Sequence, residues 1–211
     1  MKLKYVLILF VLNFICITLI YVKNDFSHVD IHYNPELAVS YSYKYINERN
    51  PNYPNFESNC ITFISQCLVA GGITMDKSNL DMPISNTKIS PTYTKWFCYS
   101  FDLDKSKPIS YYLTSTFCND TYFLYYWTKI RKIPYSCYSY NETTFKEIHD
   151  NIHVGDVIIL HGKTINHSAL ISKIDENTVY YNSNTNNRQD FPLSVLDTKD
   201  YSKITILKFT Q

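Results

Sequence analysis

Three residues that lie far apart in the sequence could together perform nucleophilic catalysis. Cys60 carries a thiol, His167 an imidazole and Asn184 a side-chain amide. A thiolate can attack an amide carbonyl, an imidazole can pass the thiol proton to the leaving amine, and a side-chain amide can fix the imidazole tautomer. Two alternatives remain open: His167 as a hydrogen-bonded residue at the start of a strand, and Asn184 as a turn residue.

Cys60 stands at the start of a predicted short helix. Ser58 or Asn59 can cap this helix, because a short polar side chain accepts a hydrogen bond from the free amides of the first turn. Gly71 is the expected left-handed residue at its end. The positive end of the helix dipole favours a thiolate over a thiol, so the position suits a nucleophile.

A packing role would also explain the residue. Cys60, Ile64 and Cys67 follow the spacing of one helix face, so Cys60 could be a small apolar residue that covers the helix start.

The last sixty residues predict a small antiparallel sheet. Its expected strands cover residues 157–160, 167–173, 178–184 and 204–209. If Lys173 pairs with Thr178, His167 faces Asn184, and both side chains lie on one side of the sheet. A slip of one residue would turn Asn184 to the other side. In that case His161, on the preceding loop, is the alternative base.

The chain begins with an apolar segment that is long enough to cross a membrane. Residues 5–22 are interrupted only by Asn13 and Thr18, and Lys2 and Lys4 precede them. No Ala-x-Ala-like cleavage site follows, which favours a signal-anchor over a signal peptide. We therefore expect residues 1–22 to be this segment, 23–32 a linker, and the rest to face outside at the cell membrane or to be secreted.

Length and composition predict one further domain, over residues 33–211. The 20 basic and 19 acidic residues leave a net charge of +1, so we expect no nucleic-acid partner. Many of the 20 tyrosines and 12 phenylalanines occur in a predicted insertion over residues 74–153. Within it, Phe123 and Trp127 have helical spacing and are expected in the core. A second helix should begin at Pro35, capped by Asn34, and bury a stripe that includes Leu37.

Five cysteines follow the apolar segment, at positions 60, 67, 98, 118 and 137. An odd number fits one free nucleophile and two disulfides, but the spacing does not determine the pairing. No closely spaced set of Cys and His predicts a zinc site. We therefore expect neither a metal nor an organic cofactor.

Several motifs in one order resemble the putative amidase domain family, a branch of the NlpC/P60 and papain-like cysteine hydrolases. They are Tyr-Asn-Pro at 33–35, Asn-Pro-x-Tyr at 50–53, Asn-Cys-Ile-Thr-Phe-Ile-Ser-Gln at 59–66, Ala-Gly-Gly-Ile at 70–73, Gly-Asp-x-Ile at 155–158, His-Ser-Ala-Leu-Ile at 167–171 and Asn-Thr-Asn-Asn-Arg at 184–188.

The resemblance implies roles for individual residues. Cys60 becomes the nucleophile and His167 the general base and acid, while Asn184 stands where the family carries a histidine. The same motif implies substrate contacts by Asn59, Thr62 and Gln66.

Three residues around the thiol depart from the family pattern. Asn59 replaces Asp, Ile61 replaces Thr, and Thr62 replaces Asn. Changes so close to the nucleophile would alter substrate contacts or rate.

Together these features predict an α+β, papain-like fold, in which the helix that begins with Cys60 packs on a small antiparallel sheet. The expected function is an extracytoplasmic cysteine amidohydrolase that cleaves a peptide amide, with cell-wall peptidoglycan as the first candidate. Two alternatives are a catalytically inactive surface module that binds wall peptides or a partner protein, and a structural membrane protein in which Cys60 is buried or disulfide-linked.

Overall fold

The computed structural model describes residues 32–80, 83–139, 144–163, 166–196 and 200–210. The predicted apolar segment and nearly all of the predicted linker lie outside these residues. Within the described ranges, no helix combines the length and apolar character that a membrane span requires. The domain is a mixed α+β structure with a six-stranded antiparallel sheet.

The predicted N-terminal helix is present as α2, Pro35–Tyr45. As predicted, the Asn34 side chain caps it and accepts a hydrogen bond from the Leu37 amide at 3.0 Å. The predicted buried stripe is partly wrong, because Leu37 is 54% exposed. Ala38 and Ile46, which the predicted stripe also contains, are buried as predicted, together with Val39 and Ser42.

The helix that begins with Cys60 is α3, Cys60–Ala70, and its first nine residues are all buried. An apolar surface on all sides is typical of a helix in the centre of a domain. The predicted left-handed residue is displaced by one position: Gly71 has φ −72°, whereas Gly72 has φ +99°. Gly71 is needed for another reason, since a Cβ there would lie 2.4 Å from the ring of Tyr33.

The large sheet has the strand order β4-β9-β5-β6-β7-β8, and all neighbouring strands are antiparallel. It contains the four predicted strands and two further edge strands, β4 and β8. The strands are β4 Tyr135–Ser139, β5 Val157–Gly162, β6 His167–Ile174, β7 Val179–Ser183, β8 Arg188–Pro192 and β9 Tyr201–Leu207. A 3-10 turn, Leu193–Val195, follows β8.

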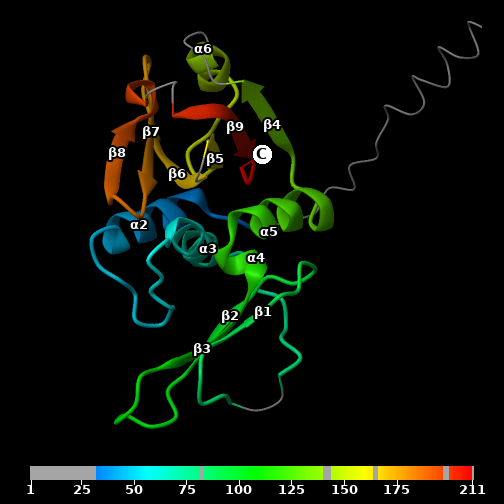
Figure 1. The fold of residues 1–211 in the computed structure, drawn as a ribbon. Helices are drawn as coiled ribbons and strands as arrows, with labels where there is room; N and C mark the ends of the chain where they lie inside the picture. Colours follow the sequence, from blue (N-terminus) through cyan, green and yellow to red (C-terminus); the bar gives the residue numbers. More distant parts are fainter. Residues whose placement is uncertain (1–31, 81–82, 140–143, 164–165, 197–199, 211) are drawn as a thin grey trace, which may run out of the picture. The chain divides into compact units, whose positions relative to one another are not determined.

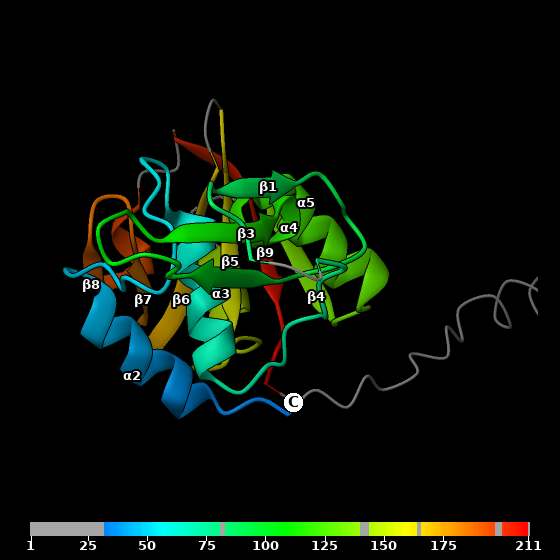
Figure 2. The ribbon, with the colours of Figure 1, turned by 90° about the horizontal axis from the view of Figure 1, so that it is seen from below.

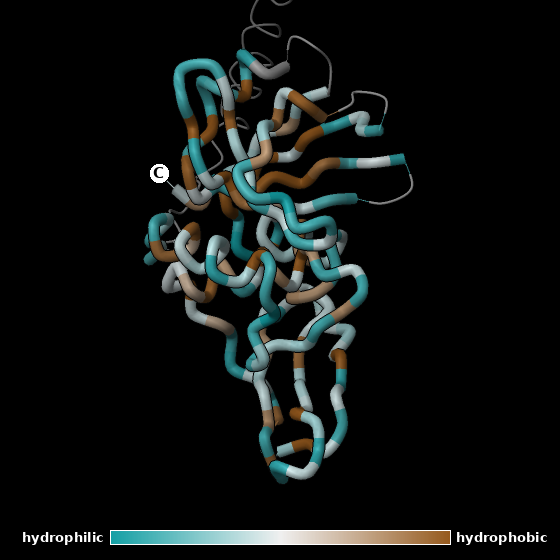
Figure 3. Tube along the Cα trace, turned by 90° about the vertical axis from the view of Figure 1, so that its left-hand side faces the viewer, coloured by the Kyte–Doolittle hydropathy of each residue, from teal (hydrophilic) through white to brown (hydrophobic). Residues whose placement is uncertain are grey.

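The two faces of this sheet belong to different apolar cores. Helices α2 and α3 lie on one side and α6, Thr144–His149, on the other (Figure 1). Ile159 and Leu170 belong to the core that contains α3, whereas Leu160 and Ala169 belong to the second core. Figure 3 shows hydrophobic segments in the strands between these cores. The face on which a side chain lies therefore decides whether it can reach Cys60.

The predicted register between the second and third strands is wrong by one residue. Leu170 pairs with Asn182, where the prediction required Tyr181. The turn closes one residue later than predicted, with Ile174 opposite Val179, and the register then shifts between Ile171 and Lys173. A bulge of this kind changes which residues share a face, and turn patterns in the sequence do not indicate it.

The region predicted as a tyrosine-rich insertion contains a second, three-stranded sheet with the order β1-β3-β2. In Figure 1 this sheet lies beyond α3 and α4, on the side away from the large sheet, and in Figure 2, seen from below, it lies in front of α3. Its strands and the helices that follow them are β1 Lys88–Ser90, β2 Cys98–Phe101, β3 Ser110–Thr114, α4 Ser115–Cys118, α5 Asp120–Tyr125 and a π-helix Tyr126–Ile130.

The aromatic run of this region packs in the core, as predicted. Phe123 and Trp127 are both 0% exposed, and their ring centroids are 6.0 Å apart. Trp127 also meets Trp96 edge-on at 5.2 Å. Because the π-helix continues directly from α5, these rings fix the position of the residue at which α5 begins, Asp120.

Candidate functional site

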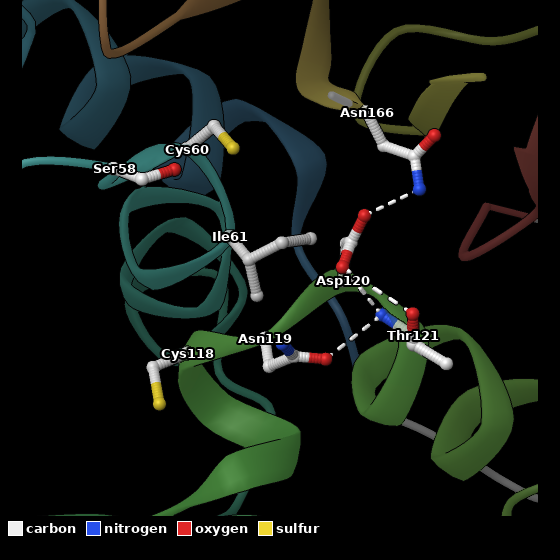
Figure 4. Close-up of a pocket in the computed structure, with 8 residues that line it drawn as sticks. All are labelled: Ser58, Cys60, Ile61, Cys118, Asn119, Asp120, Thr121 and Asn166. Atoms are coloured by element: carbon white, nitrogen blue, oxygen red, sulfur yellow. Dashed lines mark hydrogen bonds between the residues drawn. The ribbon is translucent and has the colours of Figure 1, made fainter. Parts of the chain in front are cut away.

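Cys60 opens on a cavity of about 440 Å³ at the N-terminus of α3. The residue is 6% exposed, and its sulfur points toward the part of the cavity where Asn166 and Asp120 lie (Figure 4). The cavity is lined by Ser58, Cys60, Ile61, Cys118, Asn119, Asp120, Thr121 and Asn166. The structure thus places the predicted nucleophile at a cavity with mostly polar walls.

The wall opposite Cys60 is held by a short hydrogen-bond network. The Asp120 carboxylate accepts a hydrogen bond from the Asn166 side chain and another, at 2.8 Å, from the Thr121 amide. The Asn119 side chain caps α5 and accepts hydrogen bonds from the first-turn amides at 3.1 and 3.2 Å. The carboxylate is therefore fixed from two elements, α5 and the segment just before β6.

The loop after β7 holds the N-terminus of α3. The Asn59 side chain donates to Asn184 Oδ1 at 3.1 Å, and the Asn59 amide donates to Thr185 Oγ1 at 3.0 Å. Asn184 Nδ2 in turn donates to the carbonyl of Ile46 at 3.1 Å. Asn184 is 1% exposed, so these protein groups, and not water, are its hydrogen-bond partners. The structure brings Asn184 to the residue next to Cys60.

His167 lies on the other face of the sheet. It pairs with Leu160, whose side chain belongs to the core opposite α3. Its ring centroid is 6.1 Å from that of Tyr201, which packs against the same core. Burial and the nearby positive charge of Arg188 lower the pKa of His167. The structure therefore does not bring His167 to the face that holds Cys60 and Asn184.

His161 lies on the same face as α3, two residues after Ile159 in β5. Its Nε2 is 2.8 Å from Thr205 Oγ1, and it lines a second cavity of about 380 Å³. This cavity shares Asp120, Thr121 and Asn166 with the cavity of Cys60. Burial and then Lys203 lower the pKa of His161, while the Asp120 carboxylate acts in the opposite direction.

The three predicted substrate-binding residues are buried inside the fold. Asn59, Thr62 and Gln66 are 2%, 0% and 4% exposed, and none of them is in the lining of the Cys60 cavity. Gln66 Oε1 accepts a hydrogen bond from the hydroxyl of Tyr41 at 2.8 Å. Asn59 and Gln66 therefore join α3 to neighbouring elements, whereas Thr62 Oγ1 has no hydrogen-bond partner among the described residues.

Asp120 and Asn166 line the cavity, although no pattern in the sequence marks either of them as a site residue. Asn119 and Asp120 precede the aromatic run at residues 122–127, and Asn166 directly precedes the His-Ser motif. Neither pattern indicates that the two side chains meet 46 residues apart in the sequence.

The five cysteines are all free thiols in the structure, so neither of the two disulfides that their number allowed is present. Cys118 lines the cavity of Cys60, but its sulfur points away from that of Cys60 (Figure 4). Burial raises the pKa of Cys118 to about 11. At neutral pH the Cys118 thiol is therefore protonated and a poor nucleophile.

The chain belongs to the family described as "Putative amidase domain", which it matches over residues 32–207. This match covers His161, His167, α3 and the loop that begins at Asn184. It confirms the family that the motifs resemble, and it indicates a hydrolase.

A curated relative matches a much shorter stretch. The chain is 60% identical over 38 residues to "Uncharacterized protein YhbB" of Bacillus subtilis (strain 168). These residues are 18% of this chain and 12% of that protein. No solved structure matches the chain, and the papain-like part of the fold assignment stays a prediction.

We expect Asn184→Ala to destabilise the domain by about 2–3 kcal/mol, because the buried amide of Asn59 and the carbonyl of Ile46 would both lose their partner. Urea unfolding of this variant beside Asn177→Ala, an exposed turn residue, measures the effect. If Asn184 instead serves only to orient an imidazole, stability will be unchanged and only the reactivity of Cys60 will fall.

Proposed function

We propose that this protein is an extracytoplasmic cysteine amidohydrolase that cleaves a peptide amide bond, with cell-wall peptidoglycan peptides as its first candidate substrate. One observation carries the proposal: the thiol of Cys60 opens on a cavity from the first turn of an 11-residue helix. Family membership supports the hydrolase class. The outside location rests on the apolar N-terminal segment of the sequence.

In the proposed reaction, the Cys60 sulfur attacks the carbonyl carbon of the scissile amide. Negative charge then develops on the carbonyl oxygen, and the backbone N–H of Cys60, at the start of the helix, can donate to it. The C–N bond breaks once the leaving amine receives a proton, which leaves a thioester on Cys60. Water hydrolyses this thioester and restores the thiol.

A histidine has to transfer the proton, and two candidates exist. The family resemblance assigns this role to His167, whereas the faces of the sheet favour His161. The pKa of each imidazole is lowered. Each ring therefore stays neutral, and able to accept a proton, at pH values below the usual pKa of histidine. We assign the role to His161, because it shares the face of α3 and its cavity adjoins that of Cys60.

The rate at which iodoacetamide alkylates Cys60, followed against pH, tests this assignment. A thiol paired with an imidazole should stay reactive well below about pH 8, where an ordinary thiol loses its reactivity. We expect His161→Gln to shift the reactivity profile toward that of a free thiol and His167→Gln to leave it nearly unchanged. Peptide mapping must separate Cys60 from Cys118 in the same cavity.

Each result has a clear meaning. If only His167→Gln shifts the profile, His167 is the base and β6 must rearrange in solution. If Cys60 reacts as an ordinary thiol and neither substitution changes it, the enzyme proposal fails.

The position of His167 also favours a second candidate, a catalytically inactive module that binds wall peptides or a partner protein. Such a module would keep the cavity but would not need an imidazole beside Cys60. Binding of peptidoglycan peptides that persists in Cys60→Ala, together with an ordinary thiol profile, would support this candidate.

A further inference from the structure

Among the described residues that line the Cys60 cavity, Asp120 alone carries a charge. It is half-buried, and the part of the chain that the structure describes places no Lys, Arg or His within ion-pair distance of it. A carboxylate offers about four acceptor sites. The hydrogen bonds from Asn166 and Thr121 leave acceptor capacity on this carboxylate.

Two basic residues line the second cavity, which adjoins that of Cys60. Lys129 and His161 line the second cavity, together with Asp120 itself. The lowered pKa of His161 keeps that imidazole mostly neutral. Asp120 is therefore a carboxylate without a cationic partner in the lining of the Cys60 cavity, and such a group attracts cations.

A structural role would account for part of this arrangement. An acidic residue in the first turn of a helix stabilises the helix dipole, and the hydrogen bond from the Thr121 amide serves that purpose. The hydrogen bond from Asn166 does not stabilise the helix dipole. It comes from the segment just before β6 and fixes the second carboxylate oxygen at the wall that faces Cys60 (Figure 4). A carboxylate held from two sides is preorganised for a ligand.

We propose that Asp120 is a specificity-determining residue, which receives the protonated amine of a substrate whose scissile amide lies at Cys60. Asn166 is then a positioning residue, because it orients the carboxylate. The choice of an amide substrate rests on the proposed function, whereas the preference for a cation rests on the cavity alone. Substrates with a free amino group close to the scissile bond should be preferred over the same compounds with that group acetylated.

Three thiol-specific methanethiosulfonate reagents test the charge preference without any enzymatic turnover. The 2-aminoethyl, methyl and 2-sulfonatoethyl reagents are cationic, neutral and anionic, and their rates at Cys60 are compared with those at a small free thiol. A Cys118→Ser background leaves one thiol in the cavity. We expect the ratio of the cationic to the anionic reaction rate to be about five- to tenfold higher at Cys60 than at the free thiol, because one negative charge nearby would give an effect of this size.

Asp120→Asn should abolish most of this preference, because it removes the charge and keeps the shape of the side chain. Asp104→Asn, an exposed carboxylate in the loop after β2, is the matched control and should leave the preference unchanged. An unchanged ratio in Asp120→Asn, or a Cys60 that none of the reagents reaches, would overturn the proposal.

A turnover measurement separates this proposal from the proposed function. With a peptide amide that carries a free amine, Asp120→Asn should raise KM, and acetylation of that amine should remove the difference between the variant and the parent protein. If no peptide amide is cleaved but the reagent preference depends on Asp120, the amidase proposal fails and the cation site stands. If a peptide amide is hydrolysed but Asp120→Asn changes neither the reagent preference nor KM, the amidase proposal stands and the cation site fails.

Discussion

Replacing Cys60 with alanine or serine should abolish amide hydrolysis, with a loss of about a thousandfold or more in kcat/KM. Alanine has no nucleophile, and a serine hydroxyl at this position would not ionise at neutral pH. The loss should appear in kcat rather than in KM, since the cavity walls are unchanged. Release of a free amine from muropeptides, followed by mass spectrometry, measures it.

Two other thiols provide matched controls. Cys118→Ser changes the same cavity, and Cys137→Ser changes an exposed thiol in β4. Both should retain most of the activity, because neither sulfur takes part in bond making. Equal losses in Cys60→Ser and Cys118→Ser would mean that the cavity has been distorted, and hydrolysis by Cys60→Ala would exclude covalent catalysis by this residue.

Replacing Gly155 with alanine should unfold the domain or destabilise it by about 2–5 kcal/mol. Gly155 has φ +92°, and a Cβ there would lie 2.4 Å from Cβ and 3.0 Å from Cα of Pro35. Backbone strain and overpacking each contribute about 1–3 kcal/mol. The contact matters because Pro35 begins α2, and the Tyr33 hydroxyl donates to the Gly155 carbonyl at 2.8 Å.

Gly72→Ala is the matched control for this prediction. Gly72 has a similar φ of +99°, but the atom nearest to an added Cβ is 3.5 Å away. It should therefore cost only the backbone strain of about 1–2 kcal/mol. Thermal or urea unfolding of both variants gives the comparison. Equal destabilisation would show that the φ angle, and not the contact with Pro35, requires glycine at position 155.

Local patterns determined the elements on which the site depends. The cap at Asn34, the apolar run after Asn59 and the Gly155-Asp156 turn predict α2, α3 and β5 in the places where the structure has them. Each of these signals acts over a few residues, through capping, helical spacing or a turn, so the sequence alone carries it. Motif order also determined the family, which the match over residues 32–207 confirms.

Local patterns do not determine the contacts of Asn184. The sequence predicts that Asn184 faces His167, but in the structure its side-chain amide is hydrogen-bonded to Asn59 and Ile46 instead. The cause is one register shift in the β6–β7 hairpin, between Ile171 and Lys173. A shift of one residue exchanges the faces of the strand, and its energy depends on the packing of the whole sheet.

The sequence by itself therefore determined that a helix begins at Cys60 and ends near Gly71, because these features depend on neighbours in the chain. Only the tertiary structure decided which histidine lies on the sheet face that packs against α3, and which carboxylate lines the cavity of Cys60. Strand pairing brings His161 to the cavity next to that of Cys60, and the packing of α5 brings Asp120 to both cavities. Both arrangements depend on contacts between residues far apart in the sequence. No local pattern encodes such contacts.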